Sequence, residues 1–117
     1  KNLSLYGYNT FLWSCAKFFN KNNLICSFIK FREKYFIKKF DINLNSTSKI
    51  EKVTKDEIIK KYGNNFKIIP KNIAKHFDEK ILKLDNLNIV DLEHNQLEFL
   101  KLKGLLNEEL IKPLYLS

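Results

Sequence analysis

Apolar side chains recur at helical spacing in the first third of the chain. In residues 10–20 and 24–40 they follow one another at steps of three and four, which places them on one face of an α-helix. Thr10 precedes the first segment and is a suitable N-cap. The polar stretch 20–23 separates the two segments, so the pattern predicts an antiparallel helical hairpin at the N-terminal side.

The clearest helix start lies near the middle of the chain. Thr54 and Glu57 have the spacing of a capping box, in which each side chain satisfies a free backbone N–H of the first turn. Gly63 then suits a left-handed helix end. Residues 66–69 are expected to be extended because a proline, Pro70, follows them.

Two more helices are predicted after this proline, over about residues 71–84 and about residues 89–103, the second closed by Gly104. The fold class expected is therefore all-α, a small bundle of four to five helices. One shared core is expected to contain Phe18, Phe28, Phe31, Tyr35, Ile58, Phe77, Ile81, Leu97 and Leu100.

Length and composition favour one folded domain over residues 1–117. The chain has 117 residues and a hydrophobic fraction of 44%, which is enough for a core and is unlike a disordered tail. With only three glycines and two prolines, an all-β sandwich with many tight turns is not expected. No run of 18 apolar residues occurs, so no membrane-spanning helix is expected.

Positive charge gathers in the first 40 residues. The net charge is +8, of which residues 1–40 supply +7, while residues 41–117 are nearly balanced. A basic face of this kind is solvated, or meets an acidic protein or an RNA backbone. Lys30, Lys34 and Lys38 follow at steps of four and would form one strip on a helix. The candidate partner-binding residues are Lys30, Arg32, Lys34, Lys38 and Lys39.

The basic residues are almost all lysines, which makes the positive charge weaker evidence for a nucleic-acid partner. The chain has 20 lysines but one arginine, although arginine is the usual choice for paired contacts to phosphates and bases. Lys, Asn, Ile, Phe and Tyr make up 62 of the 117 residues, and all five have codons rich in A and T. This composition is typical of an AT-rich protist genome, so mutational bias explains part of the lysine excess.

The N-terminal side also suggests a cellular setting. The chain begins with Lys1 and contains no methionine, and residues 1–32 contain no acidic residue. The lack of acids is a property of mitochondrial transit peptides, whereas the many aromatic residues and the scarcity of arginine are not. We therefore expect a mitochondrial protein whose presequence lay upstream of the chain.

Residues with catalytic or metal-binding chemistry are few and scattered. Cys15 and Cys26 have no companions at metal-ligand spacing, and His76 and His94 lie 18 positions apart. The cysteines are expected to be small buried residues. No glycine-rich phosphate loop occurs. The sequence thus predicts no catalytic site, no metal, no cofactor and a non-enzymatic role.

Basic and aromatic residues alternate between residues 18 and 40, as in KFFNK and KFREKYFIKK. Exposed aromatic rings beside lysines suit stacking on unpaired bases. The rings also keep helical spacing, which places most of them in the core. Both interpretations are open for this segment, with the core interpretation favoured.

The stretch YNTFLWSCAKFFNKNNLICSFIKFREKYFIKK resembles the start of the LYR family of small mitochondrial proteins. Tyr8 takes the position of the family's Tyr, Asn9 stands where its Arg is expected, and Phe18 takes that of the later Phe. Phe31 begins the pattern of the second helix. The resemblance implies a helical adaptor whose basic helices bind an acidic acyl carrier protein.

Two functions follow from these features. The first is a structural or adaptor subunit of a large mitochondrial assembly, LYR-like and binding an acyl carrier protein. The alternative is a small mitochondrial ribosomal protein that contacts rRNA through its basic N-terminal third. In both, the partners are other subunits of a multiprotein or ribonucleoprotein complex.

Overall fold

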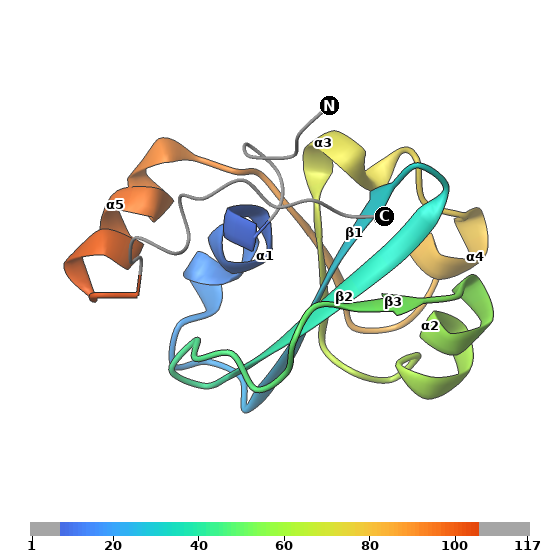
Figure 1. Cartoon of the computed structure of the whole chain (residues 1–117), viewed down its shortest axis with the longest axis horizontal. Coiled ribbons are helices and arrows are strands. Elements are labelled where there is room, and N and C mark those ends of the chain that lie inside the picture. Colours follow the sequence, from blue (N-terminus) through green and yellow to red (C-terminus); the bar gives the residue numbers. More distant parts are fainter. Residues whose placement is uncertain (1–7, 106–117) are drawn as a thin grey trace.

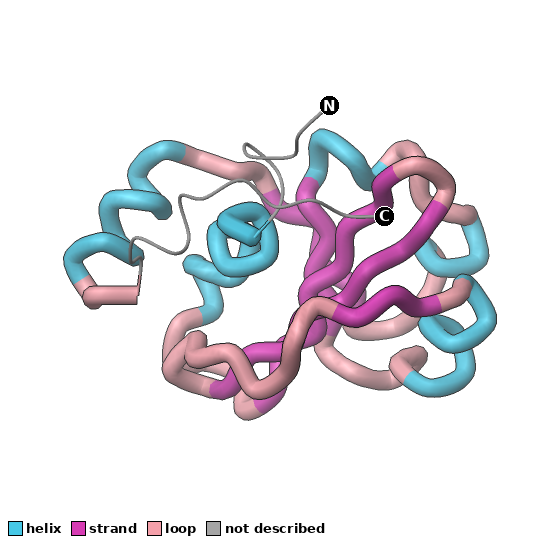
Figure 2. Tube along the Cα trace, viewed as in Figure 1, coloured by secondary structure: helices cyan, strands magenta, loops and turns pink. Residues whose placement is uncertain are grey.

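The computed structural model describes residues 8–105, with side chains described from Thr10 onward. Its elements are α1 (Tyr8–Cys15), η1 (Ala16–Phe18), β1 (Leu24–Phe31), β2 (Lys34–Asp41), β3 (Glu51–Val53), α2 (Lys55–Lys61), β4 (Lys67–Pro70), α3 (Lys71–Ala74), α4 (Glu79–Leu82), β5 (Leu87–Val90) and α5 (His94–Leu102). The five strands form one sheet with helices on both sides (Figures 1 and 2).

The fold is therefore mixed α/β, and the expectation of an all-α helical bundle is wrong. The segment 24–40, expected as a helix, is the antiparallel β1–β2 hairpin, with Leu24 opposite Asp41 and Phe31 opposite Lys34. Its apolar residues are mostly aromatic or β-branched, which favours strands. Both faces of this hairpin are buried, so apolar residues occupy positions that point to either face and also satisfy helical spacing by chance.

The sheet has the order β3-β2-β1-β4-β5. β2 runs antiparallel to both β1 and β3, while β1, β4 and β5 are parallel to one another. The α2 helix connects the antiparallel half to β4, and α3 and α4 connect β4 to β5. Parallel neighbours need such crossovers, and the crossovers cover the sheet.

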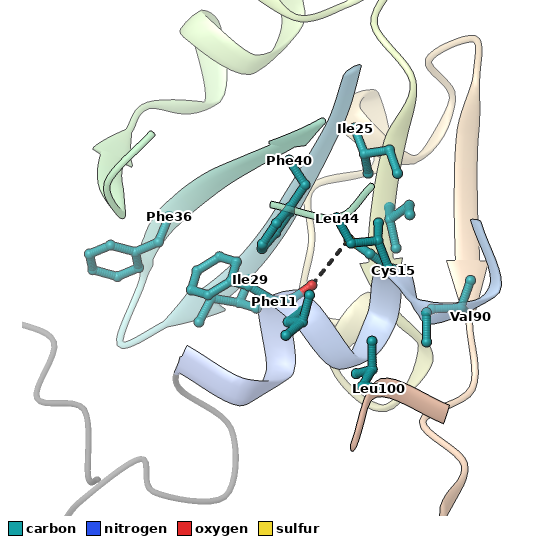
Figure 3. Close-up of a cluster of buried hydrophobic side chains, with 12 residues drawn as sticks. Phe11, Cys15, Ile25, Ile29, Phe36, Phe40, Leu44, Val90 and Leu100 are labelled. Atoms are coloured by element: carbon teal, nitrogen blue, oxygen red, sulfur yellow. Dashed lines mark hydrogen bonds between the residues drawn. The ribbon is translucent and has the colours of Figure 1, made fainter. Parts of the chain in front are cut away.

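One side of the sheet, here named the α1/α5 face, is covered by α1, η1 and α5. Its buried cluster includes Phe11 and Cys15 from α1, Ile29 from β1, Phe40 from β2 and Leu100 from α5 (Figure 3). Trp13 Nε1 donates a hydrogen bond of 2.8 Å to the Glu93 carbonyl oxygen. This bond fixes the start of α5 against α1, so segments 80 residues apart form one layer.

The opposite side, named the α2/α4 face, is covered by α2 and α4. Phe28 and Ile37 from the hairpin meet Ile58 from α2 and Ile81 from α4 in a second buried cluster. The Tyr35 hydroxyl accepts a hydrogen bond of 3.1 Å from the backbone N–H of Asp78, which joins β2 to the start of α4. Two separate cores thus replace the single core expected.

The capping box predicted for the middle of the chain is confirmed. Thr54 Oγ1 accepts from the Glu57 backbone N–H at 3.0 Å, and the Thr54 N–H donates to Glu57 Oε1 at 2.9 Å. Gly63 is not left-handed, contrary to expectation. Its lack of a side chain is still required, because a Cβ there would lie 2.3 Å from the Ile59 carbonyl oxygen.

The C-terminal helices are shorter than expected. The predicted helix 71–84 is interrupted after Ala74, and Asp78 starts α4 by accepting the Lys80 backbone N–H at 2.8 Å. The predicted helix 89–103 loses its beginning to β5. Its end is as predicted: Gly104 has a φ of 71°, and the Leu105 N–H donates to the Leu100 carbonyl in a Schellman-type end.

Lys67 on β4 is fully buried and satisfies backbone rather than a carboxylate. Its ammonium donates to the carbonyl oxygens of Gly63 at 2.7 Å, Asn65 at 2.9 Å and Asp85 at 2.6 Å. Burial lowers the pKa of this amine. All three ammonium hydrogens are used in joining two loops, so Lys67 has a structural role.

Within residues 8–105, none of the helices has both the length and the apolar character needed to span a membrane.

Candidate functional site

The turn of the β1–β2 hairpin has an unusual backbone. Arg32 and Glu33, its two central residues, have φ values of 53° and 65°. Two successive positive values match a type I′ turn, which normally takes Asn and Gly. Side chains larger than glycine cost free energy in this conformation. The chain therefore holds its one arginine, with an adjacent glutamate, in a conformation that both residues disfavour.

Beside this turn lies a groove of about 360 Å³, here named the hairpin groove. It is lined by Glu33, Lys34, Tyr35, Lys52, Val53, Thr54 and Lys55. Tyr35 pairs with Val53 and Phe36 with Lys52 across β2 and β3. Because side chains alternate along a strand, this register places Lys34 and Lys52 diagonally on the same side of the sheet.

Two of the three lysines that line the hairpin groove carry a positive charge that has no acidic partner among the described residues. Lys34 and Lys52 are exposed, and neither forms an ion pair with any carboxylate of the described residues. Lys55 lies 3.5 Å from Asp78 Oδ2. The pKa of Asp78 is lowered chiefly by the hydrogen bond from the Lys80 backbone and also by the charge of Lys55. The groove therefore presents net positive charge and suits an anion.

Three of the five predicted partner-binding residues lie at the turn end of the hairpin. Lys30 donates to the His76 carbonyl at 2.8 Å and pairs with Glu33 at 3.4 Å, so its charge is already engaged. The Arg32 guanidinium lies 5.0 Å from the centre of the Phe31 ring. Lys34 lines the groove. Figure 1 shows this end of the hairpin close to α3, which precedes the loop of His76.

The other two predicted partner-binding residues, Lys38 and Lys39, lie farther along β2, away from the hairpin turn. Lys38 is buried on the α1/α5 face, and burial lowers the pKa of its amine. Lys39 points to the opposite face, where its ammonium lies 5.3 Å from the centre of the Tyr62 ring. The expected strip of Lys30, Lys34 and Lys38 does not exist, because it required a helix and these residues lie on two strands.

The residues quoted for the LYR resemblance are placed as follows. Tyr8 and Asn9 begin α1, and their side chains lie outside the described part. Phe18 is half-buried and meets the Phe66 ring edge-to-face at 5.0 Å. Phe31 ends β1 and packs at the margin of the α1/α5 core. The second helix implied by the resemblance is the β1–β2 hairpin, so that structural expectation is wrong.

Groups with reactive chemistry are buried or apart. Both cysteines are free and buried, as expected. Burial raises the pKa of the Cys15 thiol to about 12 and that of Cys26 to about 11, which keeps both protonated and unreactive. In the described residues, no group of three or more His, Cys, Asp and Glu side chains is placed to hold a metal ion.

Sequence reasoning missed Lys52 and Lys55 as members of the site. Both lie in the nearly neutral part of the chain, 18 or more positions after Lys34. Only the pairing of β2 with β3 brings them beside the hairpin turn. The sequence pattern next to Lys52 and Lys55 is the capping box of Thr54 and Glu57, which indicates the start of a helix and does not indicate a charged site.

Comparisons with protein-family models, with curated proteins and with solved structures match nothing to this chain. The resemblance to the LYR family is thus neither supported nor refuted by any relative.

Proposed function

We propose that this protein is a non-enzymatic subunit of a large ribonucleoprotein assembly, and that it contacts RNA phosphates through the hairpin groove. One observation carries the proposal: Lys34 and Lys52 lie together on adjacent strands, with Lys55 and the Arg32 turn beside them. Lysines act on phosphates as point charges and do not need the planar geometry of arginine. A small mitochondrial ribosomal protein fits this description.

The mitochondrial setting is part of the same proposal. It is supported by the lack of acidic residues in the first 32 positions, a property of mitochondrial transit peptides. An acyl carrier protein is the other acidic partner that the first 40 residues suggested. The second of the two helices that would bind it is the β1–β2 hairpin instead, so we favour RNA as the partner.

The salt dependence of RNA binding tests the role of the groove lysines. The full chain is titrated with a labelled single-stranded RNA at several salt concentrations. The slope of log affinity against log salt should fall by about 0.7 for each phosphate that the protein no longer neutralises. A double Lys34→Gln and Lys52→Gln variant should therefore have a slope smaller by about 1.4.

A matched control removes two other exposed lysines that do not line the groove, Lys60 and Lys83. The Lys60→Gln and Lys83→Gln double variant has the same net charge but should keep a steeper slope than the groove variant. Equal slopes for the two variants would refute the hairpin groove as the phosphate site. Native purification from mitochondria that recovers an acyl carrier protein and no RNA would refute the function itself.

A further inference from the structure

Half-buried aromatic rings surround the α1/α5 face. The partly buried residues packed against its core include five phenylalanines, whereas those around the α2/α4 core are all aliphatic. The five are Phe18, Phe19, Phe31, Phe66 and Phe99. The margin of the α1/α5 face is thus largely aromatic, and that of the α2/α4 face is aliphatic.

Two of these rings line a pocket of about 480 Å³ between η1 and the first turns of α5. The lining residues are Ala16, Lys17, Phe19, Lys21, Glu93, Asn95, Gln96 and Phe99. The Phe19 and Phe99 rings meet edge-to-face, with centres 5.5 Å apart and planes at 74°. The volume is in the range of about 300–1,000 Å³ that small-ligand sites occupy. The pocket is large enough for a planar group and has aromatic walls.

Gln96 supplies an unused hydrogen-bond donor in this pocket. The residue is 7% exposed, and its Oε1 accepts the Glu93 backbone N–H at 3.4 Å. Its Nε2 forms no hydrogen bond with any other described residue. A ligand with a carbonyl or ring-nitrogen acceptor, which every nucleobase has, would satisfy this donor.

Positive charge surrounds the aromatic pair. Lys17 and Lys21 line the pocket, against the single acid Glu93. The ammonium of Lys103 lies 5.3 Å from the centre of the Phe19 ring and 5.8 Å from that of Phe99. A ligand suited to this site has a planar, hydrogen-bonding ring joined to a negative group. A nucleotide has this combination, whereas an acidic peptide side chain lacks the ring.

We infer that this pocket receives one unpaired nucleobase of a single-stranded RNA, stacked on the ring of Phe19 or Phe99 and contacted by Gln96, with its phosphates at Lys17 and Lys21. The inference rests on the proposed RNA-binding function and adds a second, base-directed contact. Stacking tolerates every base, so the pocket selects single strands over duplexes.

Leucine substitutions test the stacking contact, since leucine keeps apolar packing and removes the ring. Phe19→Leu and Phe99→Leu should each weaken binding of a labelled RNA of about 12 nucleotides roughly tenfold. Phe18→Leu is the matched control, because Phe18 is also half-buried but faces Phe66 outside the pocket. It should change the affinity less than about twofold, by the same measure. Thermal unfolding of each variant checks that it is folded.

Two further measurements use the unmodified protein. RNA carrying 5-iodouridine should photocross-link to Phe19 or Phe99, as located by mass spectrometry. An oligonucleotide of abasic nucleotides keeps its phosphates and should bind more weakly than the same length with bases. Equal affinity for the two oligonucleotides, or equal effects of Phe18→Leu and Phe19→Leu, would overturn the base pocket and leave the phosphate groove standing. Absence of any RNA binding would overturn both proposals.

Discussion

The two faces of the sheet are built from similar strands but covered in different ways. The α2/α4 face is covered by short helices from the middle of the chain, and its margin is aliphatic. The α1/α5 face is covered by segments near residues 8–18 and 94–102, and its margin is aromatic. Under the proposed function, one face serves mainly to hold the fold, while the other also presents a surface to RNA.

Individual lysines also differ in what their ammonium groups contact. Lys67, whose ammonium lies under the α2–β4 loop, has all three hydrogens bound to carbonyl oxygens. Lys17 and Lys21, beside the α1/α5 face, are exposed and have no ion pair with the described residues. A high lysine content therefore includes both structural and available cations, and net charge alone does not separate them.

Truncation of a fully buried ring should give the largest effect. Phe28 is 0% exposed in the α2/α4 core, so Phe28→Ala should lower the free energy of unfolding by about 3–5 kcal/mol. Phe99→Ala should cost clearly less, since its ring is only partly buried, yet it should weaken RNA binding. Urea unfolding measures the first effect and RNA titration the second. Equal destabilisation by the two variants would contradict the placement of Phe99 at the margin of the α1/α5 core.

Removal of the buried Lys67 ammonium should cause the second-largest loss of stability. Lys67→Met keeps the length of the side chain but leaves three carbonyl oxygens without their charged donor, at a cost of about 3 kcal/mol. Lys83→Met, at an exposed lysine just after α4, is the control and should change stability by less than about 0.5 kcal/mol. A Lys67→Met variant as stable as the control would show that the three hydrogen bonds contribute nothing net.

Local signals in the sequence predicted local structure well. The capping box at Thr54 and Glu57, the extended segment before Pro70 and the left-handed end at Gly104 are all present. Each depends on residues within a few positions of one another. Segment 24–40 was misjudged because a strand buried on both faces lacks alternation, and because the Arg32-Glu33 turn has none of the usual turn residues.

The candidate site was harder to predict because it depends on contacts between distant segments. Lys34 was identified from local charge, but Lys52 joins it only through the β2–β3 pairing. Phe19 and Phe99 are 80 positions apart and meet only because α1 and α5 share one face. Of the seven aromatic residues in 18–40, four are buried, as the core interpretation predicts: Phe28, Tyr35, Phe36 and Phe40. The base-stacking interpretation stays a prediction.

The two cysteines allow a finer comparison, since Cys15 lies on the α1/α5 face and Cys26 on the α2/α4 face. Burial raises both thiol pKa values from 9.0, to about 12 and about 11. Above pH 9 the unfolded chain releases these protons while the folded chain keeps them, so stability falls as the pH rises. Each thiol should contribute a decrease of about 1.4 kcal/mol between pH 8 and pH 10.

Alanine substitution of each cysteine in turn measures how much each thiol contributes to this loss of stability with rising pH. Urea unfolding under reducing conditions at pH 8 and pH 10 should show a decrease smaller by about 1.4 kcal/mol in Cys15→Ala and in Cys26→Ala than in the unmodified protein. Ser14→Ala, which removes a polar neighbour that does not titrate, should keep the full decrease. Above pH 11 the folded chain begins to ionise Cys26 first, so the remaining slope should depend on Cys15. If Cys15→Ala instead kept the full decrease at pH 10, the thiol on the α1/α5 face would be open to solvent, and the close packing of α1 against the sheet would be wrong.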